Sequence, residues 1–228
     1  MCPEPISGSS GPGQEPPSQL LGTSFALRAN DRWQSCGLPG CVIMASGLGK
    51  RFGGNKLMAE LGGKPLVAWA LDATEGIFQR RVVVTRHNEV AELCRRRQVP
   101  VVLHDLPYRS DTVRLGLEAL GDGLSGCMFC PGDQPLLSRE SVRAMALRAA
   151  KEQEYIWRLS YGGDAGTPVL FPRWAFPQLR ALPQGKGGSV ILKKNPGQVR
   201  LVPAPRECEL WDVDSPEDLE RVSGCLGR

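Results

Sequence analysis

One short segment of this sequence combines glycines with cations, a pairing that suits phosphate binding. Residues 44–57 read Met-Ala-Ser-Gly-Leu-Gly-Lys-Arg-Phe-Gly-Gly-Asn-Lys-Leu. Glycines let backbone N–H groups approach phosphate oxygens closely, and the cations neutralise the charge of a triphosphate. The spacing fits neither the P-loop Gly-x-x-x-x-Gly-Lys-Ser/Thr nor the dinucleotide-binding Gly-x-Gly-x-x-Gly. From this segment alone, a glycine-rich turn with solvated cations is the alternative.

Three aspartates further along the chain are suited to holding a cation beside such phosphates. Asp133 lies in Pro-Gly-Asp-Gln-Pro, directly after an apolar run. A carboxylate at the carboxyl end of a parallel strand projects into the crevice where α/β sheets bind ligands. Asp212 and Asp214 alternate in Trp-Asp-Val-Asp-Ser-Pro-Glu-Asp, and in a strand they would share one face. Magnesium needs only one or two carboxylates in a phosphate site, but a turn at Asp133 and capping of the last helix are the competing explanations.

These motifs resemble those of the nucleotidyltransferases of the nucleotide-diphospho-sugar transferase fold. More narrowly, the chain is similar to the molybdenum cofactor cytidylyltransferases and their guanylyltransferase relatives. The similarity rests on Gly-x-Gly-x-Arg-x-Gly-x-x-Lys-Leu, Leu-Gly-Gly-Lys-Pro-Leu, Gly-Asp-x-Pro and Asp-Val-Asp-Ser-Pro-Glu-Asp, and it spans about residues 40–222. It implies a Mg²⁺-dependent enzyme in which Asp133 is the principal metal ligand and Asp214 the second.

The resemblance also implies which residues contact the nucleotide. Arg51 and Lys56 would touch the NTP phosphates and, with Asp133, would be the catalytic residues. The full nucleotide-binding set is Ala45, Ser46, Gly47, Leu48, Gly49, Arg51, Lys56, Ser110, Thr112 and Asp133. Gly49 replaces a serine that is frequent in the family, so one hydroxyl contact would be lost. Ser110 is equally suited to capping the helix that follows.

The acceptor side and the base are assigned by smaller similarities. Gly166 and Pro168 belong to a segment that lines the acceptor side in the family, and Lys186 replaces an aspartate that relatives often carry. Lys186 would either contact a phosphate or close a turn. Guanylyltransferase relatives have a second glycine where this chain has Ser46. A side chain there would narrow the base pocket, so we expect CTP.

The function that follows is transfer of CMP from CTP to the phosphate of molybdenum cofactor (molybdopterin), with release of pyrophosphate. Positioning and charge neutralisation supply most of the rate in such reactions, and a phosphate acceptor needs no general base. We therefore expect His87 and His104 to be core or surface residues. The alternatives are a guanylyltransferase of the same cofactor, a sugar-phosphate nucleotidyltransferase, and a non-catalytic carrier that delivers the cofactor to a molybdenum hydroxylase. A transient contact with such a hydroxylase is expected of the enzyme as well.

Short apolar runs alternate with helical segments from residue 40 onward. Strands are expected near residues 41–44, 81–85, 101–103 and 127–129, and helices near 65–74, 89–97, 110–120 and 138–153. This alternation is typical of βαβ units. It predicts a three-layer α/β/α sandwich with a mostly parallel Rossmann-like sheet, in a single nucleotidyltransferase domain at 40–228. Further apolar runs lie at 155–161, 168–171 and 199–202, and a last helix should follow Ser215.

Composition narrows the class of protein. Residues 1–39 include a Ser-, Gly- and Pro-rich stretch, which predicts a flexible or partly ordered extension. A net charge of +4 is far from that of a dedicated nucleic-acid binder. No apolar run approaches the roughly 20 residues of a membrane span, and no secretory pattern opens the chain, so we expect a cytoplasmic protein without membrane or nucleic-acid partners. The 8 cysteines are then reduced thiols, with Cys127 and Cys130 a buried structural pair.

Overall fold

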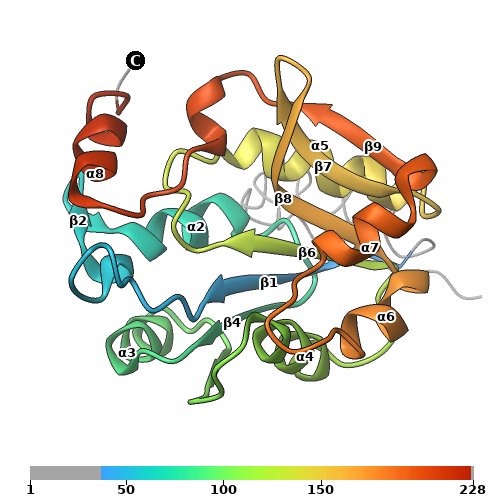
Figure 1. Ribbon diagram of the computed structural model, residues 1–228, viewed down its shortest axis with the longest axis horizontal. Helices are drawn as coiled ribbons and strands as arrows, with labels where there is room; N and C mark the ends of the chain where they lie inside the picture. The colour runs from blue at the N-terminus through green and yellow to red at the C-terminus, as the bar shows by residue number, and fades with distance from the viewer. Residues whose placement is uncertain (1–36, 227–228) are drawn as a thin grey trace, which may run out of the picture.

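The computed structural model describes residues 37–226 (Figure 1). Their centre is a seven-stranded sheet with the order β5-β4-β1-β6-β8-β7-β9. The strands are β1 (Gly40–Ala45), β4 (Arg81–Thr85), β5 (Val101–Leu103), β6 (Gly126–Pro131), β7 (Ile156–Tyr161), β8 (Asp164–Pro172) and β9 (Val199–Pro203). Almost all of the expected extension at residues 1–39 lies outside the described residues.

Most neighbouring strands run parallel. β1 pairs in parallel with β4 and with β6, and β4 pairs in parallel with β5. β8 is antiparallel to both of its neighbours, β6 and β7, and β9 is parallel to β7. In chain order the first four strands thus lie as third, second, first and fourth, the arrangement of a Rossmann half. The predicted mostly parallel sheet is confirmed.

Helices cover both faces of this sheet. The helices are α2 (Leu66–Thr74), α3 (Asn88–Arg96), α4 (Arg109–Leu120), α5 (Arg139–Lys151), α6 (Phe176–Arg180), α7 (Ser189–Lys194) and α8 (Pro216–Ser223). α2, α3 and α5 contribute to one core cluster, and α4, α6 and α7 to the cluster on the opposite face. The predicted three layers are therefore present. No helix among residues 37–226 is long and apolar enough to cross a membrane.

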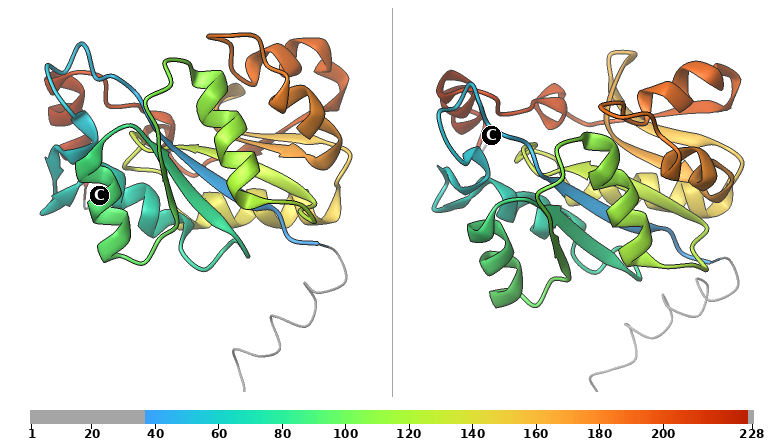
Figure 2. Two further views of the ribbon diagram at one scale, coloured as in Figure 1. Left: turned by 90° about the horizontal axis from the view of Figure 1, so that it is seen from below. Right: turned by 60° about the horizontal axis from the view of Figure 1, so that its bottom comes forward.

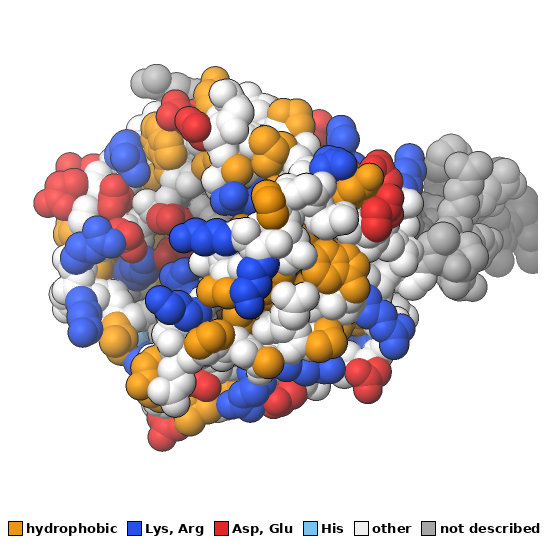
Figure 3. All heavy atoms as spheres, turned by 45° about the vertical axis from the view of Figure 1, so that its right-hand side comes forward, with side chains coloured by type: hydrophobic (Ala, Val, Ile, Leu, Met, Phe, Trp, Pro, Cys, Tyr) orange, Lys and Arg blue, Asp and Glu red, His pale blue; other side chains and the backbone are white. Residues whose placement is uncertain are grey.

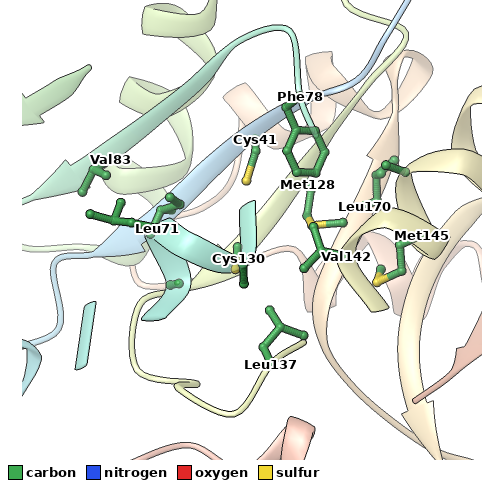
Figure 4. Close-up of a cluster of buried hydrophobic side chains, with 14 of the residues drawn as sticks. Cys41, Leu71, Phe78, Val83, Met128, Cys130, Leu137, Val142, Met145 and Leu170 are labelled. Atoms are coloured by element: carbon green, nitrogen blue, oxygen red, sulfur yellow. The ribbon is translucent and has the colours of Figure 1, made fainter. Parts of the chain in front are cut away.

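The central strands are buried on both faces, which explains their continuous apolar sequences. In β1, Cys41 and Ile43 pack toward one cluster and Val42 toward the other. Figure 4 shows Cys41 in the first cluster, together with Leu71, Met128 and Met145. On the other face α4 lies across β1 (Figure 2), and a β-carbon at its Gly116 would be 2.6 Å from a methyl carbon of Val42. This glycine lets the helix approach the sheet closely.

Two local expectations are settled by these elements. Cys127 and Cys130 are fully buried free thiols, but they belong to clusters on opposite faces of the sheet. Burial raises the pKa of Cys130 to about 12, so its thiol stays protonated. Ser110 does not cap α4, so the capping alternative for this residue is wrong. The helix begins one residue earlier, Tyr108 is the N-cap, and the Asp111 carboxylate accepts from the Tyr108 N–H at 3.2 Å.

The remaining short elements connect the sheet to its edges. These are the 3₁₀ turns η1 (Lys56–Met58), η2 (Arg173–Ala175), η3 (Pro196–Gln198) and η4 (Glu207–Leu210), and the small ladder of β2 (Glu60–Leu61) with β3 (Lys64–Pro65). The last helix, α8, begins as predicted: the Ser215 side chain accepts from the Asp218 N–H, and Pro216 fills the first position.

Candidate active site

A cleft of about 810 Å³ opens at the carboxyl ends of the parallel strands. Figure 3 shows Lys and Arg side chains gathered around a hollow in this surface, beside acidic ones. The cleft lining includes most of the predicted site residues: Ser46, Gly47, Leu48, Gly49, Arg51, Lys56, Thr112, Asp133, Lys186 and Asp214. It does not include Ala45, Ser110, Gly166 or Pro168.

The four predicted residues outside the lining pack against other parts of the protein. Ala45 and Ser110 are buried, and a β-carbon at Gly166 would lie 2.7 Å from the Leu210 side chain. Pro168 is also buried. The residue between Gly166 and Pro168, Thr167, faces the cleft instead.

The glycine-rich loop folds back on itself at Gly49. This residue has φ +57°, and its carbonyl oxygen accepts from the N–H of Phe52 at 2.9 Å and of Gly53 at 3.2 Å. A β-carbon at position 49 would lie 2.3 Å from the Gly54 carbonyl oxygen, so the serine that the resembling family carries there does not fit this conformation. Among the described residues, no protein group accepts from the backbone N–H of Leu48 or Gly49. Such unpaired N–H groups are suited to an anion.

Lys56 lies at the closed end of the cleft. Its side chain is 6% exposed, and its Nζ donates to Asp133 Oδ2 and Asp214 Oδ1, each at 2.6 Å. Burial alone would lower the pKa of Lys56, but the two carboxylates outweigh it and hold the pKa above its usual value. The neighbouring Leu57 packs into the core and fixes the start of this turn. Lys56 is therefore a fixed, fully charged ammonium.

The two aspartates are brought together from distant parts of the chain. Gly132, just before Asp133, donates its N–H to the Met44 carbonyl at 3.0 Å, which ties the end of β6 to β1. The Val213 N–H donates to the Asp133 carbonyl at 3.0 Å, which holds the 211–214 segment against this point. That segment forms no strand, so the alternation expected of a strand does not place Asp212 and Asp214 on one face, although both line the cleft.

The pKa values of Asp214 and Asp212 are shifted in opposite directions. Hydrogen bonding to Lys56 lowers the pKa of Asp214, and Arg51 adds to this effect through an ion pair of 2.5 Å. Asp212 also lines the cleft, where desolvation and the neighbouring Asp133 carboxylate raise its pKa to about 6. The cleft end therefore carries more negative charge than Lys56 alone compensates.

Asp133 and Asp214 are the residues that could hold a divalent cation, although the Lys56 ammonium lies between their facing oxygens in the structure. Their facing oxygens are at most about 5.2 Å apart, since each is 2.6 Å from the same Lys56 nitrogen. In residues 37–226 no group of three Cys, His, Asp or Glu side chains forms a closed metal cage. Two hard oxygen ligands without a cage are what Mg²⁺ uses when phosphates and water complete its shell.

The other half of the cleft has an apolar floor with one partly buried cation, Arg158. Phe129 on β6 pairs in register with Val169 on β8, and Val169 pairs with Arg158 on β7. All three line the cleft. The Arg158 guanidinium donates to the carbonyls of Ala165 at 2.8 Å and Gly166 at 3.2 Å, and burial lowers its pKa. No carboxylate within residues 37–226 forms an ion pair with Arg158, whose pKa is shifted by burial alone.

Arg158 and the two histidines were missed from the sequence. Arg158 is a single cation inside an apolar run, the one signal that could have indicated it. His87 and His104, which were expected to be core or surface residues, both contact the glycine-rich loop. His104 Nε2 lies 2.8 Å from Ser46 Oγ, and His87 Nε2 lies 2.8 Å from the Gly47 carbonyl oxygen.

Comparison with known proteins gives this geometry a context. Residues 41–199 match the family described as the MobA-like NTP transferase domain. Purine catabolism protein PucB of Bacillus subtilis (strain 168) is 25% identical over 198 residues, which cover 79% of this chain and 94% of that protein. The crystal structure of Rv0371c from Mycobacterium tuberculosis H37Rv superposes with a TM-score of 0.72 at 21% identity, over 82% of this chain and 98% of that one, and so has the same fold.

Two further relatives differ in the nucleotide that their names specify. The 2-C-methyl-D-erythritol 4-phosphate cytidylyltransferase of Halalkalibacterium halodurans is 28% identical over 187 residues, which cover 77% of this chain and 69% of that protein. A probable molybdenum cofactor guanylyltransferase of Pyrococcus furiosus is 25% identical over 193 residues, which cover 79% of this chain and 94% of that protein. Both cytidylyl and guanylyl transfer thus occur among proteins similar to this one.

Proposed function

Because the chain belongs to the MobA-like NTP transferase family and is a nucleotidyltransferase, we propose that it transfers CMP from CTP to the phosphate of a molybdopterin-type cofactor and releases pyrophosphate. One observation carries the proposal. Unpaired backbone N–H groups of the glycine-rich loop, the Lys56 ammonium and the carboxylates of Asp133 and Asp214 meet at one end of a single cleft.

The chain's own groups supply positioning and charge in this reaction. The NTP phosphates would lie along the loop, where the N–H groups of Leu48 and Gly49 are available. Lys56 would stabilise the charge that develops at the α-phosphate. Arg51, whose side chain is 75% exposed, would reach the β- and γ-phosphates. The acceptor phosphate is already ionised, so it attacks the α-phosphorus in line without a general base.

Asp133 and Asp214 would hold a magnesium ion in this reaction. When bound there, Mg²⁺ would neutralise part of the negative charge of the phosphates. Removal of divalent cations with EDTA should abolish turnover, and added Mg²⁺ should restore it. Circular dichroism in EDTA provides the control, because the expected loss of activity should leave the fold unchanged. Full turnover in EDTA would contradict the magnesium proposal.

The proposal of CTP rests on Ser46. Its side chain lines the cleft, and its hydroxyl is occupied by the Val84 carbonyl and His104. The hydroxyl therefore has no spare proton for a base, and Ser46 would act by taking up space that a glycine leaves open. A smaller base pocket favours a pyrimidine over a purine.

The acceptor half supports a phosphate on a ring system better than a sugar phosphate. Its floor is apolar at Phe129 and Val169, whereas sugar hydroxyls need hydrogen-bonding partners. Arg158 on the floor and the exposed Lys186 at the rim add positive charge for the phosphate-bearing end. The dinucleotide product would then be delivered to a molybdenum hydroxylase.

Pyrophosphate release is the test, measured with Mg²⁺ and each of the four NTPs, with and without molybdopterin. Release with CTP and cofactor together is the expected result. Release with GTP and cofactor would show that the base is guanine and not cytosine. Turnover with a sugar phosphate would show that the proposed acceptor is wrong. No release with any pair would contradict catalysis and favour a carrier of the finished cofactor.

A further inference from the structure

Two histidines reach the first residues of the glycine-rich loop from neighbouring strands. His104 directly follows β5, and its backbone N–H donates to the Thr85 carbonyl at 3.0 Å. His87 lies between β4 and α3, and its backbone N–H donates to Thr85 Oγ1 at 3.1 Å. Both rings are thus anchored on the rigid edge of the sheet, and both end on the loop.

The hydrogen-bond partners determine where each ring carries its proton. A carbonyl oxygen only accepts, so His87 Nε2 donates to Gly47. The Ser46 hydroxyl has one proton, which it donates to the Val84 carbonyl at 3.0 Å. His104 Nε2 must therefore donate to Ser46 Oγ. Each histidine acts on the loop as an Nε2–H donor.

The bond from His87 sets the direction of the next backbone N–H. In a trans peptide, the Gly47 carbonyl and the Leu48 N–H point in opposite directions. A carbonyl held on His87 therefore turns the Leu48 N–H to the other side of the chain. Leu48 lines the cleft, and no group in residues 37–226 accepts from its N–H. His87, a residue outside the loop, therefore orients the Leu48 N–H that an anion would contact.

The bond from His104 acts one residue earlier. Ser46 is the first residue after β1, and its hydroxyl spans from the Val84 carbonyl on β4 to the His104 ring beyond β5. Thr85 Oγ1 donates to the Ala45 carbonyl at 2.8 Å and adds a second tie at the same point. The loop therefore leaves the sheet in a fixed direction.

We propose that His87 and His104 are positioning residues, which hold the glycine-rich loop in the geometry that receives the NTP phosphates by donating their Nε2–H groups. This inference rests on the proposed function, which gives the loop its ligand. It predicts that the position of the donor matters, and not only the size or polarity of the ring.

Glutamine and asparagine variants separate these two requirements. The amide nitrogen of glutamine can replace Nε2, whereas that of asparagine lies near the place of Nδ1. His87→Asn and His104→Asn should each raise the KM for the NTP about tenfold, the cost of roughly one hydrogen bond, with little change in kcat. His87→Gln and His104→Gln should stay within about threefold of the native KM, since a donor remains in place.

Limited proteolysis tests the same proposal without any nucleotide. Trypsin cleaves after Lys50 and Arg51, which are exposed in the loop. Cleavage there depends on how often the loop opens, so each Asn variant should be cut about tenfold faster than the native protein, and each Gln variant at close to the native rate. The melting temperature, measured in parallel, reports any loss of global stability. If His104→Asn does not fold, Ser46→Ala removes the same hydrogen bond from the other end, together with the bond from Ser46 to the Val84 carbonyl.

The outcomes are distinguishable. Native cleavage rates and native KM values in both Asn variants would overturn the proposal. Equal acceleration in the Asn and Gln variants would also overturn it, because ring packing rather than N–H donation would then hold the loop. Faster cleavage in the Asn variants of a protein that binds no NTP would support the positioning role and contradict the proposed function alone.

Discussion

The two halves of the sheet present different chemistry to one cleft. In the parallel half, β5-β4-β1-β6, the strand ends carry charged groups and unpaired N–H groups that suit any NTP. In the half formed by β8, β7 and β9, Val169 of the antiparallel β8 belongs to an apolar floor, and β7 brings Arg158, which has no acidic partner in residues 37–226, into the cleft. Under the proposed function, the groups that act on the NTP and those that select the acceptor would therefore lie in different halves of the cleft. Substitutions in the parallel half should leave the KM for the acceptor unchanged, and substitutions in the other half should leave the Kd for the NTP unchanged.

Asp133→Ala, a substitution in the parallel half, should give the largest effect on turnover. It removes a carboxylate that contacts Lys56 and that we propose as a magnesium ligand. Turnover should fall by on the order of 10²–10³-fold or more, by analogy with the loss of one electrostatic stabiliser. Single-turnover pyrophosphate release measures this. Near-native activity in this variant would remove the basis for the proposed site.

Lys56→Met should come next. The variant keeps the length of the side chain but leaves Asp133 and Asp214 without their shared ammonium. We expect kcat to fall by about 10²-fold, because the charge is needed in the transition state. The KM for the acceptor should not change. A rise in the KM for the NTP with an unchanged kcat would instead assign Lys56 to ground-state binding.

Arg158→Met tests the other half. A guanidinium without an acidic partner should bind an anionic or carbonyl-rich part of the acceptor, so the acceptor KM should rise about tenfold. The Kd for the NTP, measured by titration, should remain native. Arg200→Met, in the neighbouring strand β9 and exposed, is the matched control and should change neither constant. Weaker NTP binding by Arg158→Met would contradict the proposal that the two halves act separately.

Asp212 should produce the smallest effect, visible in the pH dependence of stability. Its pKa is raised from 3.8 to about 6, so folding favours the protonated carboxyl. A group with a raised pKa stabilises the fold below its unfolded pKa, and this contribution is lost as the pH rises through the folded pKa. As the pH rises from 4 to 6, the melting temperature of the native protein should therefore fall relative to that of Asp212→Asn, which has no carboxyl group to ionise at this position. Parallel curves for the two proteins would contradict the assignment.

The parallel half was also easier to predict from the sequence than the half formed by β8, β7 and β9. Strand β4, residues 81–85, appears as predicted, because a strand buried on both faces is a continuous apolar run. β8 begins at Asp164 rather than near residue 168, since its first residues are exposed and carry no apolar signal. Arg158 shows no local signal beyond a lone cation in an apolar run.

Contacts between distant residues set the other limit. The bonds of His87 to Gly47 and of His104 to Ser46 join residues 40 and 58 positions apart, which no local pattern contains. Lys56, Asp133 and Asp214 were assigned to one site by family resemblance, and the structure brings them within hydrogen-bonding distance. Their functional roles rest on the experiments above.

The turn at Gly49 has a consequence for how this loop can change over time. A β-carbon there would meet the Gly54 carbonyl oxygen at 2.3 Å, and the positive φ disfavours any other residue. A serine at position 49 is therefore accessible only after residues 53 and 54 have rearranged. Substitutions at position 49 and at positions 53 and 54 should therefore be epistatic, and a serine at position 49 should be tolerated only after the other end of the loop has changed.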